Sequence, residues 1–237
     1  MGSAKYKRVL LKLSGEAFLG GRESGIDFEA TQELAKEIAD VIKLGIEIAI
    51  VSGGGNLFRG RSGAKVGMDE ATADYIGMVA TLMNSLSLQD ALEKIGVPTR
   101  VMTAIEAQKV AEPYIRRRAI RHMEKGRVVV CAGGIGSPFF TTDTAGVLRA
   151  IELKCEIMLK ASNIDGVYDA DPKQIKDAQK FHELSYREVI EKHLKALDMT
   201  AVSLAREKKL PIEIFDFFTK GNLKKVILGK RVGTLIK

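Results

Sequence analysis

Three apolar segments of this sequence end in glycines, and a helical pattern of apolar residues follows each of them. The segments are residues 8–13, which run into Ser14-Gly15, residues 46–51, which run into Ser52-Gly53-Gly54-Gly55-Asn56, and residues 127–131, which run into Ala132-Gly133-Gly134. Strands that alternate with helices are typical of a largely parallel sheet with helices on both faces. Ligands of such sheets bind at the carboxyl ends of the strands. The sequence therefore predicts an α/β fold with three glycine turns at that edge.

The remaining elements continue the alternation. Helices are expected over residues 29–44, 69–94, 143–153 and 198–209, and a capping box of Ser185 with Glu188 opens another. Asp27 is the expected cap of the first helix, and Pro113 is expected to interrupt a helix. Further strands are expected over residues 99–102, 156–160 and 212–217, and residues 224–228 and 234–236 complete the pattern. Because no linker-like composition separates these segments, we expect a single domain over residues 1–237.

Composition limits the function classes. The 237 residues are 46% hydrophobic, and no apolar run approaches the ~20 residues of a membrane span, so a cytoplasmic protein is expected. Cys131 and Cys155 lie inside apolar runs, which indicates buried thiols in a reducing compartment. The net charge of +7 suits an anionic partner. Its basic clusters lack interleaved aromatic residues, which favours solvated helix faces over a nucleic-acid site. A small phosphate-bearing ligand would suit the charge equally well.

Glycines after a strand let backbone N–H groups approach a phosphate, and the next helix adds its positive N-terminal dipole. One such turn is as easily structural, but three in one sheet favour phosphate binding. The sequence does not match either of two familiar phosphate-binding motifs, because a required residue is replaced in each. Arg61 stands where a P-loop requires lysine, and Phe58 stands where the dinucleotide fingerprint requires its third glycine.

Five charged residues lie beside the turns: Lys12, Arg59, Asp74, Asp143 and Asp198. Lys12 could be an edge residue with its ammonium in water, but its place at a strand end beside a glycine turn favours contact with phosphate. The three histidines have no metal-ligand spacing, and we expect them at the surface.

Several segments are specific in combination. They are Lys12-Leu13-Ser14-Gly15-Glu16-Ala17, Gly53-Gly54-Gly55-Asn56-Leu57-Phe58-Arg59-Gly60, Asp74-Tyr75-Ile76-Gly77-Met78, Pro138-Phe139-Phe140-Thr141-Thr142-Asp143 and the stretch Asp165 to Pro172. Together they resemble the bacterial UMP kinases of the amino acid kinase family, from Lys5 to about Ile236. The resemblance implies a three-layer α/β/α sandwich and an ATP- and Mg2+-dependent transfer of the γ-phosphoryl group to UMP, giving UDP in pyrimidine nucleotide biosynthesis. An acceptor that is already an anionic phosphate needs no strong base, so catalysis is expected from alignment and charge neutralisation.

The resemblance also assigns residues. The ATP site would comprise Lys12, Leu13, Ser14, Gly15, Gly55, Arg59, Ser162, Asn163, Tyr168 and Asp171. The UMP site would comprise Gly54, Asp74 and the segment Ile135, Gly136, Ser137, Pro138, Phe139, Phe140, Thr141 and Thr142, here called the acceptor loop. The catalytic set would be Lys12, Arg59, Asp143 and Asp198. The two aspartates would orient Lys12 or the hydrated metal, and no direct metal ligand is assigned. The acceptor half would span about residues 1–153 and the ATP half about residues 154–237.

Two features of the resemblance concern specificity and regulation. Ile135 and Ser137 stand where many relatives have Thr and Asn, which makes the uracil contacts of this loop less defined. The family is typically hexameric, activated by GTP and inhibited by UTP. Arg100 and Arg127 match positions of the GTP site, and residues 22–27 add a similar match.

Two other readings stay open on sequence alone. A kinase of the same family that phosphorylates a carboxylate or carbamate would share the ATP half, although Asp74 and the acceptor loop favour a nucleotide acceptor. A non-catalytic nucleotide sensor or nucleic-acid binder would use the basic clusters instead of the turns.

Overall fold

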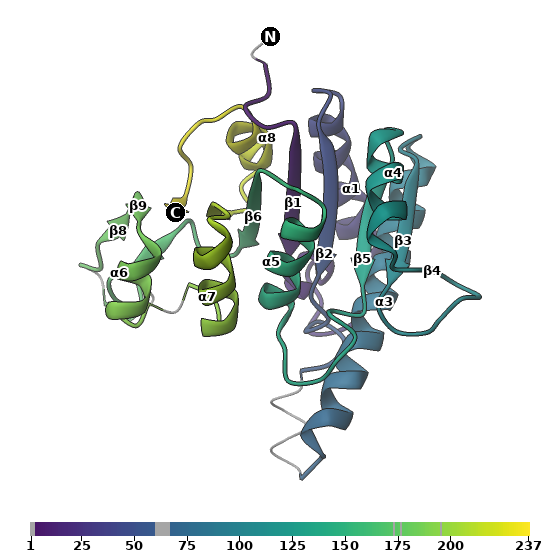
Figure 1. Ribbon diagram of the computed structural model, residues 1–237, viewed down its shortest axis with the longest axis horizontal. Helices are drawn as coiled ribbons and strands as arrows, with labels where there is room; N and C mark the ends of the chain where they lie inside the picture. The colour runs from purple at the N-terminus through teal and green to yellow at the C-terminus, as the bar shows by residue number, and fades with distance from the viewer. Residues whose placement is uncertain (1–2, 60–66, 173, 176, 195) are drawn as a thin grey trace.

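The computed structural model describes residues 3–59, 67–172, 174–175, 177–194 and 196–237. Within these residues a nine-stranded sheet runs in the order β4-β3-β5-β2-β1-β6-β10-β11-β9 (Figure 1). Neighbouring strands are parallel except for the antiparallel pair β10 and β11. The strands are β1 Arg8–Leu13, β2 Glu47–Ser52, β3 Thr99–Thr103, β4 Glu112–Pro113, β5 Val128–Ala132, β6 Ile157–Ser162, β9 Glu183–Leu184, β10 Ile212–Asp216 and β11 Thr234–Ile236. A separate small hairpin pairs β7 Val167–Tyr168 with β8 Lys180–Phe181.

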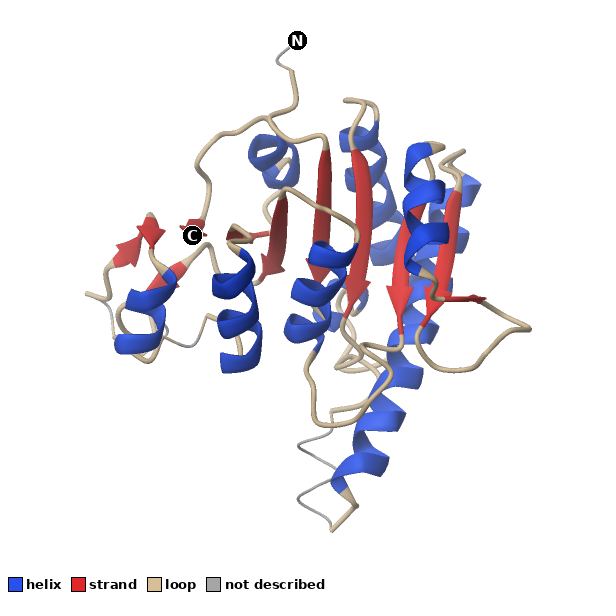
Figure 2. Ribbon diagram, in the orientation of Figure 1, coloured by secondary structure: helices blue, strands red, loops and turns tan. Residues whose placement is uncertain are grey.

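Helices cover both faces of the large sheet (Figure 2). One face packs against α1 Phe28–Ile42, α3 Glu70–Lys94 and α8 Asn222–Ile227. The other packs against α4 Arg116–Glu124, α5 Thr142–Glu152, α6 Tyr186–Glu191 and α7 Met199–Lys208. Successive residues of β1 enter different cores, Leu10 on the α5 side and Leu11 on the α1 side, because side chains alternate across a strand. Burial on both faces explains the continuous apolar runs in the sequence. The α/β prediction is confirmed.

Most predicted element ends lie within two residues of the observed ones, and capping residues mark several helix starts. Ala30 N donates to Asp27 Oδ1 at 2.9 Å where α1 begins, and the capping box of Ser185 and Glu188 opens α6. One expectation is wrong. Pro113 does not interrupt a helix but lies in the edge strand β4, where its missing N–H costs no ladder bond. Residues 224–228 fall in and after the short helix α8.

The glycine turns lie together at one edge of the sheet, as expected. Parallel register aligns Leu13 with Ser52 and Val51 with Cys131, so β1, β2 and β5 end side by side. Between the turns after β2 and β5 lies α3, which extends beyond the sheet at this edge (Figure 1). This edge holds most of the residues that the sequence singled out.

Both cysteines are buried free thiols, as predicted, and burial raises the pKa of Cys131 to about 12. The surface prediction holds for His182 and His193 but not for His122, whose side chain is only 12% exposed and lies 3.2 Å from Glu112. Among the helices of the described residues, none has the length and apolar character needed to cross a bilayer.

Candidate functional site

A buried carboxylate between two lysines forms the centre of the site. Lys12 at the end of β1 and Lys160 near the end of β6 are register partners on adjacent strands. Asp143, in the first turn of α5, lies 2.7 Å from Lys12 Nζ through Oδ1 and 2.6 Å from Lys160 Nζ through Oδ2. The three side chains are only 11–16% exposed. Two cations share one anion at the edge where the glycine turns meet, so the cluster carries a net positive charge available to phosphate.

The cluster shifts the pKa values of its members. Burial alone would raise the pKa of Asp143, but the charges of Lys12 and Lys160 outweigh it and hold that pKa below its usual value. Burial lowers the pKa of Lys160, and the neighbouring Lys12 lowers it further, although Asp143 opposes both. Asp143 is therefore ionised at neutral pH and acts here as a partner for the lysines rather than as a base.

Asp198 does not contact Lys12 directly among the hydrogen bonds of the described residues. It caps α7 through Ala201 N and accepts hydrogen bonds from Thr141 Oγ1 at 2.5 Å and Thr144 Oγ1 at 2.9 Å. Thr141 is itself the cap of α5. Asp198 thus ties the start of α7 to the start of α5, and so to the acceptor loop that precedes α5.

The first two glycine turns touch backbone to backbone. A Cβ on Gly15 would lie 2.8 Å from Gly55 N and 2.7 Å from Asn56 Oδ1, so only glycine lets the turn after β1 approach the turn after β2. A Cβ on Gly54 would lie 2.8 Å from both Gly77 O and Ala80 Cβ of α3. These contacts, rather than unusual backbone angles, explain the glycines at positions 15 and 54.

Side chains of the predicted ATP site meet around the turn after β1. Ser14 caps the short 3-10 helix Gly15–Phe18 by accepting from Glu16 N. Glu16 accepts a hydrogen bond of 2.9 Å from Asn163 Nδ2 and lies 3.8 Å from Arg59 Nη2. Arg59 is largely exposed and donates to Gly55 O at 3.2 Å. The next residues, 60–66, which include Arg61 of the P-loop comparison, lie outside the described part of the chain.

A pocket of about 440 Å³ opens beside Lys160. Three predicted residues, Ser162, Tyr168 and Asp171, line it, whereas Asn163 is turned to Glu16 instead. The hydroxyl of Tyr168 donates to Asp165 at 2.7 Å, and this bond raises the pKa of the phenol. The sequence did not indicate that residues 192–194, between α6 and α7, would also line the pocket.

The acceptor loop folds against α3. Asp74 Oδ2 accepts a hydrogen bond of 2.6 Å from Phe139 N, so these two predicted parts of the UMP site are in contact. Phe139 has a positive φ of 71° and is 66% exposed, and Phe140 is 47% exposed. Ile135, Gly136 and Pro138 are half-buried, whereas Ser137 is exposed.

Arg149 holds the base of this loop. It is 5% exposed, donates to Gly134 O at 3.2 Å, pairs with Glu152 at 2.7 Å and lies over the Tyr114 ring at 3.8 Å. Tyr114 in turn donates to Glu152 at 2.7 Å. A buried arginine bound on three sides fixes the loop backbone more rigidly than a flexible lysine would.

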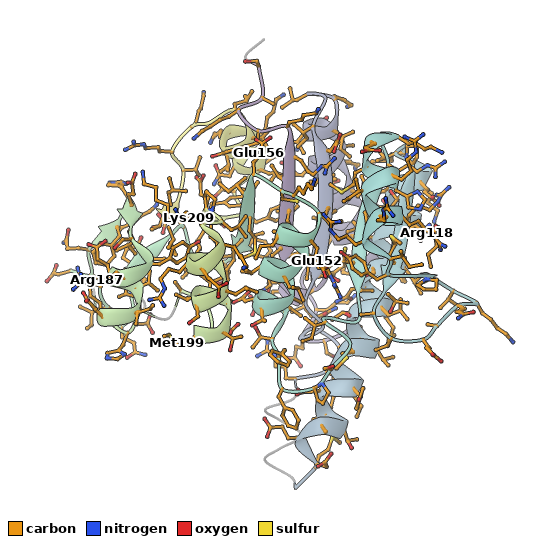
Figure 3. The ribbon with its side chains drawn as sticks, in the orientation of Figure 1. Arg118, Glu152, Glu156, Arg187, Met199 and Lys209 are labelled. Atoms are coloured by element: carbon orange, nitrogen blue, oxygen red, sulfur yellow. The ribbon has the colours of Figure 1, made fainter. Side chains whose placement is uncertain are left out.

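The two predicted regulatory arginines lie around Glu112 of the edge strand β4, at the other end of the strand order from β9. Arg100 Nε lies 3.9 Å from Glu112, and Arg127 contacts His122, which contacts Glu112 in turn. Arg118 of the same cluster lies 3.7 Å from Glu112, and Figure 3 shows it on the far side of the molecule from Arg187. The pair Arg22 and Asp27 lies elsewhere, on the segment between the 3-10 helix Gly15–Phe18 and α1.

Sequence reasoning missed Lys160 and Arg149. Both stand in apolar segments, as Lys12 does, and a charge inside a buried strand or helix was the signal that could have found them. Within the described residues, no group of three or more His, Cys, Asp and Glu side chains is placed to hold a metal ion.

The comparisons with known proteins agree with this geometry. The model of the amino acid kinase family matches residues 7–216. A UMP kinase structure from Bacillus anthracis has 42% identity and a TM-score of 0.95, and the match covers 98% of this chain and 96% of that one. A UMP kinase from Ureaplasma parvum has 32% identity and a TM-score of 0.93, over 98% and 99% of the two chains. A uridylate kinase from Archaeoglobus fulgidus has 29% identity and a TM-score of 0.72, over 97% and 99%. With its sheet order, its glycine turns and these matches, the chain belongs to the amino acid kinase family.

Proposed function

We propose that this protein is a UMP kinase that transfers the γ-phosphoryl group of ATP to UMP. The observation that carries the proposal is the Lys12–Asp143–Lys160 cluster at the edge where the glycine turns and the acceptor loop meet. Two UMP kinase structures with 42% and 32% identity over almost the whole chain support the choice of acceptor.

Charge neutralisation is the chemistry that these residues can supply. Phosphoryl transfer spreads negative charge over the oxygens of the moving group, and the cations stabilise it without a change of covalent bonds in the protein. Lys12 would contact the transferred group from β1, and Lys160 would neutralise charge from β6. Asp143 holds both ammonium groups in place. The backbone N–H groups of Gly15 and Gly55 and the Arg59 guanidinium would hold the ATP phosphates.

The acceptor side uses α3 and the acceptor loop. Asp74, which already accepts from Phe139 N, has free lone pairs for ribose hydroxyls. Gly54, packed on α3, would present its backbone to the UMP phosphate. Thr142 would add its hydroxyl as a donor, and Thr141, whose hydroxyl donates to Asp198, would contribute through its backbone. In this scheme Ser162, Tyr168 and Asp171 surround the adenosine in the pocket beside Lys160.

Mg2+ fits this site as an ion carried mainly by the phosphates. Magnesium commonly keeps waters and binds through one or two carboxylates plus substrate phosphates, which suits a site without a three-ligand protein cage in the described residues. Asp143 and Asp198, the two carboxylates of the catalytic set, would orient its waters. When bound, the ion would neutralise charge on the phosphates.

Organisation and regulation follow as parts of the same proposal. Residues 1–153 would form the acceptor half and residues 154–237 the ATP half of a single domain. The enzyme would act in the cytoplasm as a hexamer, and GTP would activate it at the site of Arg100 and Arg127, with UTP as inhibitor. A titration with GTP tests the last point, because an unchanged rate would refute activation.

The proposal is tested by coupled ADP release with ATP, Mg2+ and a panel of acceptors: UMP, CMP, AMP, aspartate and acetylglutamate. We expect a strong preference for UMP. Turnover with acetylglutamate or aspartate but not with UMP would identify a kinase for carboxylates. If none of the acceptors supports ADP release, the result would favour the nucleotide sensor.

A further inference from the structure

The long helix α3 carries a buried polar face beneath the glycine turns. Thr81, Asn84 and Ser85 are 0–3% exposed, in a helix whose other buried residues are mostly apolar. Buried polar side chains are costly unless hydrogen-bonded, so each should have a partner that explains it. Their partners belong to two of the three glycine turns.

Asn84 and Asn56 form a closed amide pair. Asn84 Nδ2 donates to Asn56 Oδ1 at 2.8 Å, and Asn56 Nδ2 donates to Asn84 Oδ1 at 3.0 Å. The second hydrogen of each amide goes to a backbone carbonyl, from Asn84 to Gly53 O at 2.7 Å and from Asn56 to Gly25 O at 2.9 Å. All four N–H groups are used, so no other side chain of similar size satisfies the same partners.

Asn56, which the amide pair holds in place, also packs closely against the turn after β1. Its Oδ1 would lie 2.7 Å from a Cβ on Gly15, and its own backbone follows Gly55. Gly25 N also donates to Asn56 O at 2.9 Å, which fixes the residue from a second side. The amide pair therefore joins α3 to both backbone turns of the proposed ATP-phosphate site.

Thr81 serves the third turn. Its Oγ1 accepts from Gly133 N at 2.9 Å and donates to Met78 O at 2.7 Å. Gly133 precedes Gly134, whose carbonyl Arg149 binds, and the acceptor loop begins at the next residue. Thr81 thus fixes the backbone from which the acceptor loop starts, one helical turn away from Asn84.

We infer that Asn84 and Thr81 are positioning residues that divide the two substrates between them, Asn84 for ATP and Thr81 for UMP. The inference rests on the proposed function for the identity of the substrates. Neither side chain reaches the reacting groups, and each acts through the backbone that it holds. Gly54 of the acceptor site has a support of its own, because it packs directly on Gly77 O and Ala80 of α3, while Asn84 binds the carbonyl of the preceding Gly53.

The test compares Asn84→Ser with Thr81→Val, and each variant is a control for the other because they lie on the same helix. Serine at position 84 is too short for either carbonyl partner, and valine is isosteric with threonine but accepts no hydrogen bond. Thr81→Ser, which keeps the hydroxyl, should restore the wild-type behaviour. Thr99→Val removes a buried hydroxyl that bonds Val97 O at 3.0 Å at the far end of β3, and it controls for lost stability.

The readouts are KM for each nucleotide, kcat, the Kd of a non-hydrolysable ATP analogue and of UMP by calorimetry, and Tm. Small displacements of binding groups cost about tenfold or more. We therefore expect Asn84→Ser to raise KM and Kd for the ATP compounds about tenfold, with the UMP values within about twofold. Thr81→Val should show the reverse, and Thr99→Val should lower only Tm.

Equal effects of both variants on both nucleotides, or a lower Tm with unchanged nucleotide binding, would overturn the inference. If Asn84→Ser does not fold, Asn56→Ser tests the same amide pair from the turn, with the same expected loss of ATP-analogue affinity. If the wild type does not phosphorylate UMP, the proposed function fails, but calorimetry with the ATP analogue still decides the role of Asn84.

Discussion

Replacing Asp143 by asparagine is the most direct perturbation of the site. The carboxylate holds two ammonium groups at 2.7 and 2.6 Å and is 14% exposed. At an effective dielectric constant of about 20, Coulomb's law gives each contact about 6 kcal/mol of attraction before desolvation is counted. Desolvation of the three charges offsets much of this, and removal of one partner from a buried pair typically costs about 3–5 kcal/mol. Because one carboxylate serves two lysines, we expect Asp143→Asn to lose at least about 3 kcal/mol of unfolding free energy.

The assay is urea unfolding of Asp143→Asn beside Asp40→Asn. Asp40 pairs with Lys43 at 2.9 Å, but both side chains are more than half exposed, so the same substitution there should cost less than about 0.5 kcal/mol. The kcat of Asp143→Asn should also fall, since Lys12 and Lys160 then repel each other and lose their positions. Equal stability losses in the two variants would refute the argument that the cluster is a buried, coupled unit.

The pH dependence of the unfolding free energy tests the direction of the pKa shift of Asp143. The folded pKa of Asp143 is lowered, so its stabilising contribution is fully present above its unfolded pKa of about 3.9 and is lost as the pH falls through the folded value. The difference in unfolding free energy between wild type and Asp143→Asn should therefore be constant near neutral pH and shrink only in acid. A difference that grew on acidification would contradict the assigned direction.

Three further variants test other parts of the site. Lys12→Ala should reduce kcat by about a hundredfold or more, because it removes a preorganised charge from the transferred group, while the far-UV circular dichroism stays native; unchanged turnover would remove Lys12 from the mechanism. Arg149→Lys should raise KM for UMP about tenfold, since lysine cannot both bind Gly134 O and stack on Tyr114, and kcat should change less; an unchanged KM would show that the loop does not need this anchor. The folded pKa of Lys160 is lowered, so the unfolded state binds more protons than the folded state between that value and about 10.4. The unfolding free energy of the wild type should therefore rise with pH through this window, and Lys160→Met should abolish the rise. Parallel stability curves for the two proteins between pH 8 and 10 would contradict that shift.

The order of strands and helices could be predicted because local signals mark it. Asp27, Ser185 and Asp198 cap helices in the structure as their sequence positions suggested. The short strands β4, β7, β8 and β9 have two residues each, which is too few for any periodicity to be seen. Such strands exist because tertiary neighbours offer partners, and a sequence pattern carries no information about those neighbours.

The site residues likewise divide into those that the sequence indicates and those that only the fold brings together. Lys12 and Asp143 could be chosen from their places beside the turns. The third member, Lys160, is marked in the sequence as a charge inside an apolar strand, but its partnership with Lys12 follows only from the pairing of β6 with β1. Asn84 is a similar case. It reads as one more polar residue on a long helix, and its role depends on Asn56, which reaches it only through the fold.

The central position of β1 also affects how the molecule is made. The first strand of the chain pairs with β2 on one side, but on the other side it joins Val9 to Ile157 and Lys12 to Lys160, after more than half of the chain has been synthesised. Closing so long a loop is slow compared with local pairing, and an apolar strand edge stays open until then. We therefore expect the nascent chain to need protection of that edge, and the binding site for the donor nucleotide to form among the last contacts of folding.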